Sequence, residues 1–266
     1  MIKQVTMKNN RGTVITTKFN ELGDELEYIN SDGARHKNEY DSENRIIRRI
    51  NTHGEYTAIY DYEYNEEGML AKTNFNGVIT EYIYDDKGRT TGIIMDDGQV
   101  YKFNHNDRDD VIFETCTKNG EVEYTTTHEY DYENLTQVTK CNSRIMGSST
   151  KTIKYRKTIG EDETYYKDSF GSEYWKEYNE RGLITRYIDI SDFEKIYTYD
   201  DNGNLISMKD SLGFEKSCEY DDKGRIIKYE ISTGVKITKE YNDRGDVIKK
   251  ENLTTGVIEE FEYIYY

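Results

Sequence analysis

The chain of 266 residues contains no proline. An average sequence of this length would carry roughly 13, at a usage near 5%. Proline cannot donate a hydrogen bond to a neighbouring strand, so strands and tight turns offer it few positions. Its absence therefore favours a chain made almost entirely of strands and short turns. A biased nucleotide composition of the gene is an additional explanation.

Long apolar runs are also absent. The first residues, MIKQVTMKNNRGTV, lack the apolar core of a signal peptide, and no later stretch is long and apolar enough to cross a membrane as a helix. We therefore expect a cytoplasmic protein that does not associate with membranes. Export by a machine that needs no signal peptide is the alternative.

Signatures of catalysis and metal binding are missing. Cys116, Cys141 and Cys218 are far apart and odd in number, which excludes a disulfide framework and predicts reduced thiols. No glycine-rich phosphate loop or nucleophile elbow occurs. The four histidines show no metal-ligand spacing, and we expect a structural or surface role for them: His36, His53, His105 and His128. We predict no enzyme, no cofactor and no metal. A calcium site at 103–110 is the weaker alternative to an ordinary turn there.

The composition is polar and acidic. Hydrophobic residues make up 35% of the chain and charged residues 33%, and the formal net charge is -16. This charge argues against direct binding to nucleic acid through phosphate contacts. Acidic residues that keep a repetitive β protein soluble are the simplest explanation. Basic protein partners and mimicry of nucleic acid are alternatives.

The chain contains 26 tyrosines, and many of them belong to a repeated sequence pattern. Tyr199-Asp200-Asp201-Asn202-Gly203 returns as Tyr220-Asp221-Asp222-Lys223-Gly224, and the pattern extends along the whole chain. A second set of glycines, among them Gly33, Gly54 and Gly213, lies between these copies. Most intervals are about 21 residues. We predict structural turn glycines at Gly23, Gly68, Gly88, Gly182, Gly203, Gly224 and Gly245.

The residue pattern of one repeat unit predicts two short strands and two tight turns. Asp or Asn before glycine suits a type I turn, and glycine supplies the left-handed residue of a bulge that restores strand pairing. Alternating tyrosines before the turn share one face of a strand. About eleven such units predict an all-β fold of some 22 strands and essentially no helix. We interpret residues 1–266 as one repeat domain.

A flat sheet of 22 strands, some 105 Å long at about 4.8 Å per strand, would coil or split. We expect one coiled antiparallel sheet, a spiral shell or a solenoid, filled by its own side chains and too narrow for a cargo domain. The less regular stretch 140–150 is expected to be an irregular insertion with a long loop.

The unit Tyr-x-Tyr-Asp-x-x-Gly-Arg, at Tyr82 to Arg89, resembles the RHS repeat, also called the YD repeat. A similar unit runs from Cys218 to Arg225, and the resemblance extends over nearly all of the chain. Members of that family build β-strips that coil into shells around a toxin, or form adhesion segments. This chain shows neither the self-cleaving core nor a toxin segment after the repeats. The resemblance therefore implies a short array of repeats alone.

These features lead to a leading hypothesis: a non-catalytic intracellular protein that binds or neutralises a protein partner, such as a toxin or immune effector, in microbial or phage conflict. The last strand-like segment is a candidate partner-pairing edge through Phe261, Tyr263 and Tyr265, including a homodimer through this edge. A strand that only closes the last hairpin is the alternative. A carbohydrate-binding or surface-attachment module and an acidic nucleic-acid mimic are the rival functions.

Overall fold

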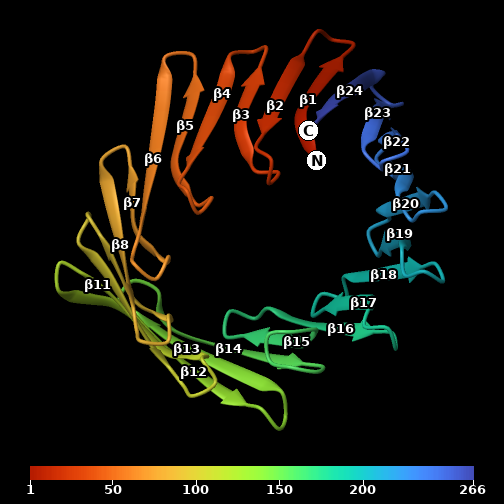
Figure 1. The fold of residues 1–266 in the computed structure, drawn as a ribbon. Coiled ribbons are helices and arrows are strands. Elements are labelled where there is room, and N and C mark those ends of the chain that lie inside the picture. The colour runs from red at the N-terminus through yellow and green to blue at the C-terminus, as the bar shows by residue number, and fades with distance from the viewer.

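The computed structural model describes residues 1–266, which form 24 β-strands and no helix. Figure 1 shows them following one another around a ring. The strands are β1 (Ile2–Asn9), β2 (Val14–Phe19), β3 (Glu25–Asn30), β4 (Ala34–Tyr40), β5 (Ile46–His53), β6 (Tyr56–Tyr64), β7 (Leu70–Phe75), β8 (Val78–Tyr84), β9 (Thr90–Met95), β10 (Gln99–His105), β11 (Val111–Lys118), β12 (Glu121–Asp131), β13 (Thr136–Ser143), β14 (Gly147–Tyr155), β15 (Glu163–Asp168), β16 (Glu173–Tyr178), β17 (Ile184–Asp189), β18 (Glu194–Tyr199), β19 (Leu205–Asp210), β20 (Glu215–Tyr220), β21 (Ile226–Ile231), β22 (Lys236–Tyr241), β23 (Val247–Asn252) and β24 (Val257–Tyr265).

Each strand pairs antiparallel with the next one in the chain, and the last strand pairs with the first. The β1–β24 register runs from Ile2 opposite Tyr265 to Asn9 opposite Glu259. The two chain ends therefore lie side by side, as Figure 1 shows. The all-β prediction is confirmed, whereas the expected open spiral or solenoid is wrong because the sheet closes on itself. Closure leaves no strand edge without a partner.

The number of strands also differs from the prediction. Eleven units of two strands account for 22 strands, but the structure has 24. The eleven acidic-rim turns join β2 to β3 and so on to β22 and β23, so the two additional strands are the end strands β1 and β24. These two strands pair with each other and thereby close the sheet.

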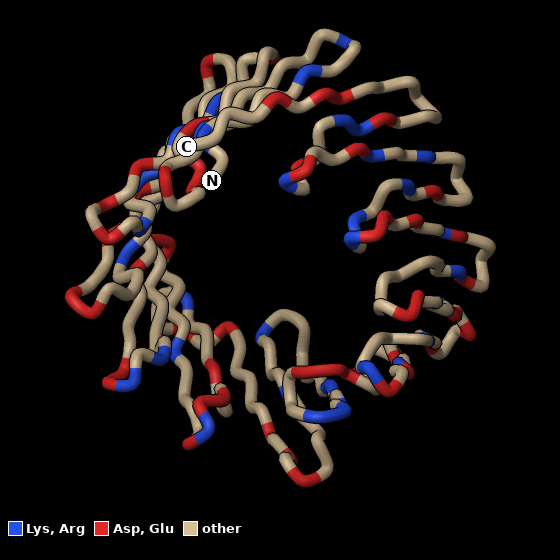
Figure 2. The backbone as a smooth tube through the Cα atoms, turned by 45° about the vertical axis from the view of Figure 1, so that its right-hand side comes forward, with Lys and Arg blue, Asp and Glu red and all other residues tan.

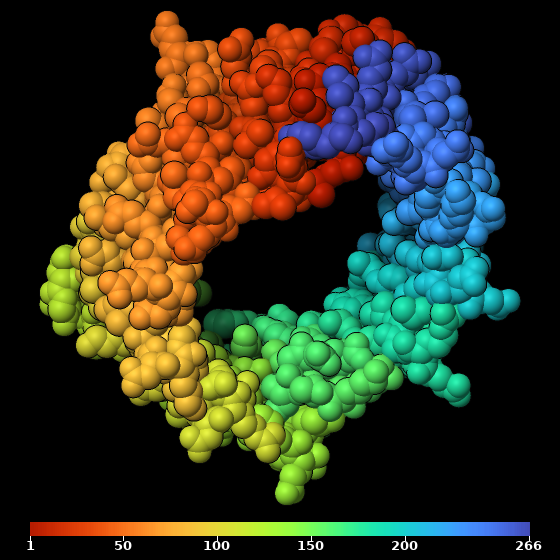
Figure 3. Space-filling model, in the orientation of Figure 1, coloured from red at the N-terminus to blue at the C-terminus, as the bar shows by residue number.

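The ring has an open centre. In the space-filling view of Figure 3, side chains leave a wide central opening instead of filling it. At about 4.8 Å per strand, 24 strands form a circumference of roughly 115 Å, too large for one layer of side chains to fill. Only 8 of the 266 residues are buried. The expectation of a shell packed with its own side chains is therefore wrong.

The stretch 140–150 forms a regular hairpin. β13 and β14 pair over eight residue positions, from Thr136 opposite Lys154 to Ser143 opposite Gly147. Only Arg144, Ile145 and Met146 connect the two strands. The expected long loop is wrong because Gly147, at φ 74°, allows a tight turn without a local tyrosine motif.

An antiparallel meander places alternate turns at opposite ends of the strands. We call one end the acidic rim: it holds the turns that follow the even-numbered strands, together with both chain termini. The other end, the tip rim, holds the turns that follow the odd-numbered strands. The acidic-rim turns are 20–24, 41–45, 65–69, 85–89, 106–110, 132–135, 156–162, 179–183, 200–204, 221–225 and 242–246.

The two faces of the sheet differ in chemistry. One face carries tyrosines and nearly all the buried side chains, including Cys116 and Cys218. The other face carries ion pairs within and between strands, such as Lys228 with Glu219 on the neighbouring strand β20 and with Glu230 on its own strand β21. Such exposed pairs contribute little stability individually, so tyrosine packing and closure of the backbone ladder hold the ring together. The structure has no helix able to span a membrane.

Candidate binding surfaces of the ring

Nine of the eleven acidic-rim turns, all except 132–135 and 156–162, share a hydrogen-bonded geometry that is clearest at Asp85. Its Oδ1 accepts the backbone N–H groups of Lys87 and Arg89 at 2.9 and 3.0 Å. Its Oδ2 accepts the Arg89 Nε at 2.7 Å. The Arg89 side chain is the main cause that lowers the pKa of Asp85 to about 2, and the two backbone amides add to it. The Asp or Asn that begins each of these nine turns is therefore a turn-forming group.

All seven predicted turn glycines lie in acidic-rim turns and have positive φ. Three turns place another residue there, namely Asn44 at φ 62°, Asp109 at 66° and Leu135 at 51°. Asn and Asp tolerate this left-handed conformation better than other residues with a side chain. The φ angles of the seven are 95° at Gly23, 81° at Gly68, 78° at Gly88, 80° at Gly182, 91° at Gly203, 75° at Gly224 and 92° at Gly245.

Tyrosines at the ends of even-numbered strands fasten neighbouring strands at this rim. The Tyr220 hydroxyl donates to the Leu205 carbonyl oxygen at 2.9 Å, and the Tyr241 hydroxyl donates to that of Ile226 at 2.8 Å. In each case the acceptor is the first residue of the preceding odd-numbered strand. Burial is the main cause that raises the pKa of these phenols above 10. The same contact is made by Tyr40, Tyr64, Tyr84, Tyr130, Tyr178, Tyr199 and Tyr263.

Arginines connect consecutive turns around the rim. The Arg89 guanidinium donates to the Asn106 carbonyl oxygen at 3.1 Å and to Asp109 at 2.9 Å, both in the next turn. Arg181 donates to the carbonyl oxygens of Asp201 and Asn202 at 2.7 and 2.8 Å. These contacts neutralise part of the rim and fix the spacing of its turns.

The acidic rim still holds most of the net charge of the molecule. Its eleven turns carry 21 Asp and Glu residues against 10 Lys and Arg residues, a net charge of -11 out of -16. The twelve turns of the tip rim carry only 5 acidic and 2 basic residues. On the strands, acidic and basic residues are intermixed and nearly balance in number, as the red and blue segments of Figure 2 illustrate. The acidity that composition reports is thus concentrated at one end of the strands.

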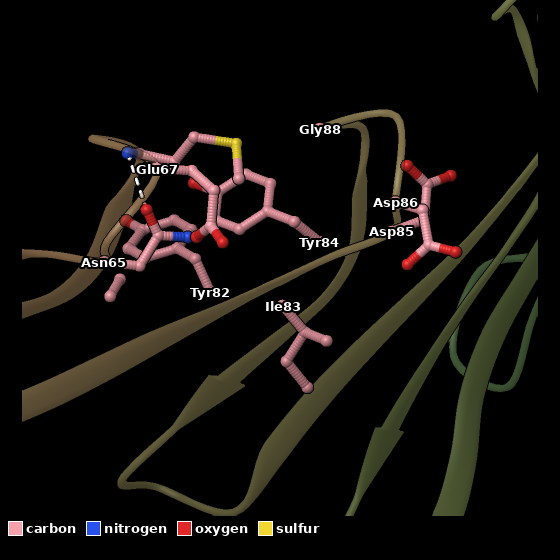
Figure 4. Close-up of a pocket in the computed structure, with 10 residues that line it drawn as sticks. Asn65, Glu67, Tyr82, Ile83, Tyr84, Asp85, Asp86 and Gly88 are labelled. Carbon is pink, nitrogen blue, oxygen red and sulfur yellow. Dashed lines mark hydrogen bonds between the residues drawn. The ribbon is translucent and has the colours of Figure 1, made fainter.

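A groove opens on the acidic rim between the turns 65–69 and 85–89. It has a volume of about 710 Å³, and its apolar lining includes Met69, Tyr82 and Tyr84. Asn65, Glu67, Asp85 and Asp86 contribute polar groups to the lining. In Figure 4, Tyr82 and Tyr84 lie on the side of Asn65 and Glu67, whereas Ile83 points the other way. The groove therefore combines aromatic surface with carboxylates.

The predicted partner-pairing edge is not free, so that prediction is wrong. β24, which contains Phe261, Tyr263 and Tyr265, pairs with β23 on one side and with β1 on the other. The Tyr263 hydroxyl donates to the Val247 carbonyl oxygen at 2.7 Å, and that of Tyr265 donates to Asp246 at 2.8 Å. The ring uses these backbone and hydroxyl groups internally. A homodimer by edge pairing through this strand would require opening it.

The histidines and cysteines are dispersed. His36 stacks on Tyr28 with ring centroids 4.7 Å apart and contacts Glu25, and His128 Nδ1 lies 2.9 Å from Thr139 Oγ1. All three cysteines are free, with Cys116 and Cys218 buried and Cys141 partly exposed. No group of three His, Cys, Asp or Glu residues is arranged to hold a metal ion. The segment 103–110 ends β10 and forms the turn to β11, where Asn106 accepts the Arg108 and Asp110 amides.

Sequence reasoning missed three features. Ring closure depends on the pairing of the first and last strands, which no local sequence pattern indicates. Separation of charge between the rims requires assigning each turn to one end of the sheet. The third feature is a set of exposed apolar tips, of which Leu212 is 84% and Ile145 is 83% exposed. A signal for it existed, because such residues lie beside the glycines of the tip rim.

Comparison with known proteins places no family on this chain. No protein-family model matches the sequence, and no curated protein matches it. The resemblance to RHS repeats remains a prediction from the sequence pattern.

Several solved structures resemble the chain at low identity. The TcdB2-TccC3 structure is 12% identical, with 91% of this chain covered and a TM-score of 0.42. The Tc holotoxin pore of Photorhabdus luminescens gives the same values. This chain spans only 18% of the length of those chains. A porin-like protein from Bacteroides uniformis is 11% identical, with 99% of this chain and 98% of that chain covered and a TM-score of 0.33.

Proposed function

We propose that this protein is a non-catalytic binding protein whose acidic rim holds a protein partner with a basic surface. The observation that supports the proposal is the net charge of -11 in the eleven turns of that rim. Complementary charge attracts a basic partner and accelerates its encounter. The groove with Tyr82, Tyr84 and Met69 adds apolar contact area on the same rim. In keeping with the repeat pattern, we propose a toxin or an immune effector in microbial or phage conflict, inside the cell, as the partner.

The charge density of the rim favours a protein partner over mimicry of nucleic acid. Spread over a circumference of roughly 115 Å, the rim carries about one net charge per 10 Å. Duplex DNA carries about one per 1.7 Å of axis. The rim is thus about sixfold less dense in charge than the molecule it would imitate. A basic protein patch needs no such density for binding.

A variant pair tests the proposal. Asp86, Asp201 and Asp222 are second residues of their turns, and their carboxylates accept no hydrogen bond within the molecule. Their replacement by Asn removes three charges from the acidic rim and leaves the turn-forming aspartates. The matched control removes three charges from the tip rim through Asp32→Asn, Glu55→Gln and Asp192→Asn.

The measurement is capture of proteins from a host lysate by the immobilised full chain at low salt, with mass spectrometry of the eluate. We expect a basic protein that is retained by the wild type and the control, and weakened at least tenfold by the acidic-rim triple variant. Equal capture by all three proteins, or no captured protein at low salt, would contradict the proposal. Competition by duplex DNA for the captured protein would indicate mimicry instead.

A carbohydrate-binding module is the second candidate, and the aromatic groove favours it. Tyr82 and Tyr84 offer ring surface beside the polar groups of Asn65 and Asp86, a combination that suits sugar rings. Binding to a glycan array that Tyr82→Ala abolishes, with no protein captured from lysate, would establish this function in place of the first.

A further inference from the structure

The tip rim has an apolar half and a more polar half; the polar half carries four of the five acidic residues of this rim, and its most exposed apolar side chains are Tyr56 (62%), Val78 (55%) and Val122 (53%). In the half formed by β13 to β24, the turns and the residues beside them carry large apolar side chains that are mostly exposed to solvent. We call this set the apolar arc. It consists of Ile145 (83% exposed), Met146 (75%), Phe170 (68%), Ile190 (61%), Leu212 (84%) and Leu253 (50%).

The arc is extensive for a free surface. Monomeric proteins rarely expose contiguous apolar patches beyond a few hundred Å². With about 180 Å² for each fully exposed side chain of this size, the arc presents on the order of 700 Å². A stable protein–protein interface buries about 800 Å² on each partner. The arc therefore approaches the area of a complete interface.

The charges around the arc distinguish between classes of partner. Between β13 and β24 the tip rim carries one basic residue, Arg144, and one acidic residue, Asp192. The acidic residues of the other half are Asp32, Glu55, Asp96 and Asp97. The arc is thus neutral and offers nothing to a strongly charged ligand. A surface with the same neutral and apolar character complements it.

We propose that the apolar arc is the interface of a homodimer, in which it packs on the arc of a second copy. A two-fold axis through the middle of the arc, between the Ile190 and Leu212 hairpins, maps the arc onto itself and gives a closed contact. A molecule of net charge -16 normally repels its copy. Contact through the arc places the neutral regions together and the two acidic rims at the far ends of the strands.

This dimer goes beyond the proposed function and does not depend on it. The predicted edge pairing of β24 plays no part in it, because β24 is paired with β1 inside each ring. A dimer with an acidic rim at each end would be bivalent. Two partner molecules, or two sites on one partner, would bind at once with increased avidity.

Sedimentation equilibrium of the full chain at about 1 to 100 μM tests the dimer. The chain has a mass of 31.4 kDa, so the wild type is expected to approach twice that mass as its concentration rises. The variant Phe170→Glu, Leu212→Glu places four carboxylates in the otherwise neutral two-fold interface, those at position 212 opposite Ile190 of the second copy. We expect its dissociation constant to rise at least 100-fold, with an unchanged circular dichroism spectrum because both side chains are exposed.

The matched control is Tyr56→Glu, Val78→Glu, which adds the same charge to exposed apolar positions of the polar half of the tip rim. The control is expected to dimerise like the wild type. Higher salt is expected to leave the dimer intact or to tighten it, because it screens the repulsion between the acidic copies. A wild type that stays monomeric at 100 μM would overturn the proposal. So would a control variant that weakens the dimer as much as the arc variant does, or a monomer that binds neutral lipid vesicles through the arc.

Discussion

At the scale of single residues, the first Asp or Asn of most acidic-rim turns and the tyrosine that precedes it define the local structure. The carboxylate or amide oxygen accepts two backbone amides of its own turn, as Asn179 does for Arg181 and Leu183 at 3.0 Å. The preceding Tyr178 donates to the Glu163 carbonyl oxygen at 2.8 Å. One residue closes the turn and the other ties it to the strand before. This chemistry was readable from the sequence, because it is local.

The neighbouring residues Asp85 and Asp86 allow a hydrogen-bonded carboxylate to be compared with one that accepts no hydrogen bond. Asp85 accepts three hydrogen bonds in its turn, whereas the Asp86 carboxylate accepts none within the molecule. We expect Asp85→Ala, which removes all three acceptors, to lower the urea midpoint of unfolding clearly, and Asp86→Ala to leave it nearly unchanged. Unfolding curves followed by circular dichroism measure both variants. Equal midpoints for the two would show that the turn hydrogen bonds contribute no stability.

The lowered pKa of Asp85 also predicts a pH dependence. Its folded-state pKa is about 2, below the ordinary value of 3.8. The stabilisation is therefore present above pH 4 and is lost as the pH falls through the folded-state pKa. We expect wild-type stability to decline between about pH 4 and pH 2, and Asp85→Asn to show a shallower decline. Urea midpoints measured along this pH series provide the test.

The buried tyrosines predict that the protein also loses stability at high pH. Burial raises the pKa of Tyr124 and of Tyr130 to about 12, with nearby carboxylates adding to the effect. A raised pKa means that stability is complete below pH 10 and is lost as the pH rises through 12. Absorbance of tyrosinate should therefore show a late titrating group in the wild type that Tyr130→Phe reduces. Ionisation of every tyrosine near pH 10 in the folded protein would contradict the burial described above.

At the scale of strands and turns, each hairpin depends on a left-handed residue. Asn44 and Asp109 occupy the position that glycine takes in most copies, so the chain itself indicates which substitutions the turn tolerates. The alternating tyrosines and the Asp or Asn and Gly residues of the turns predicted strands wherever the tyrosine motif was clear. The stretch 140–150 was mispredicted because its turn lacks that motif and is formed instead by Gly147 and by the Ser143 hydroxyl, which accepts two turn amides.

A pair of substitutions at Gly224 tests this requirement. The residue has φ 75°, and a β-carbon at this position would have only Asn204 within 4 Å, at 3.8 Å. Space is therefore available, and backbone strain decides the outcome. We expect Gly224→Val to cost about 1–2 kcal/mol and Gly224→Asn about 0.5 kcal/mol or less. A valine variant as stable as the asparagine variant in urea unfolding would contradict the left-handed assignment.

At the scale of the whole molecule, closure and charge separation emerge from topology. The meander assigns alternate turns to opposite rims, and this assignment converts a diffuse net charge into an acidic rim and a largely neutral apolar arc. Both surfaces were invisible in the composition. The β1–β24 pairing was equally invisible, because it joins opposite ends of the chain, such as Thr6 and Glu262. Local patterns specify the strands but do not specify whether the sheet coils or closes.

Closure is the claim on which the two rims and their proposed partners rest, and a cross-link across the β1–β24 pair tests it most directly. Thr6 and Glu262 lie opposite each other in the register. The double variant Thr6→Cys, Glu262→Cys should form an intramolecular disulfide under mild oxidation, identified by peptide mapping as a 6–262 link at monomer mass. The control Thr6→Cys, Glu240→Cys places the second thiol on β22, which β23 and β24 separate from β1, and should not form a link to residue 6. Efficient 6–262 linkage within one chain is the result that a closed ring predicts. Its absence, or links found only between chains, would contradict the closed ring.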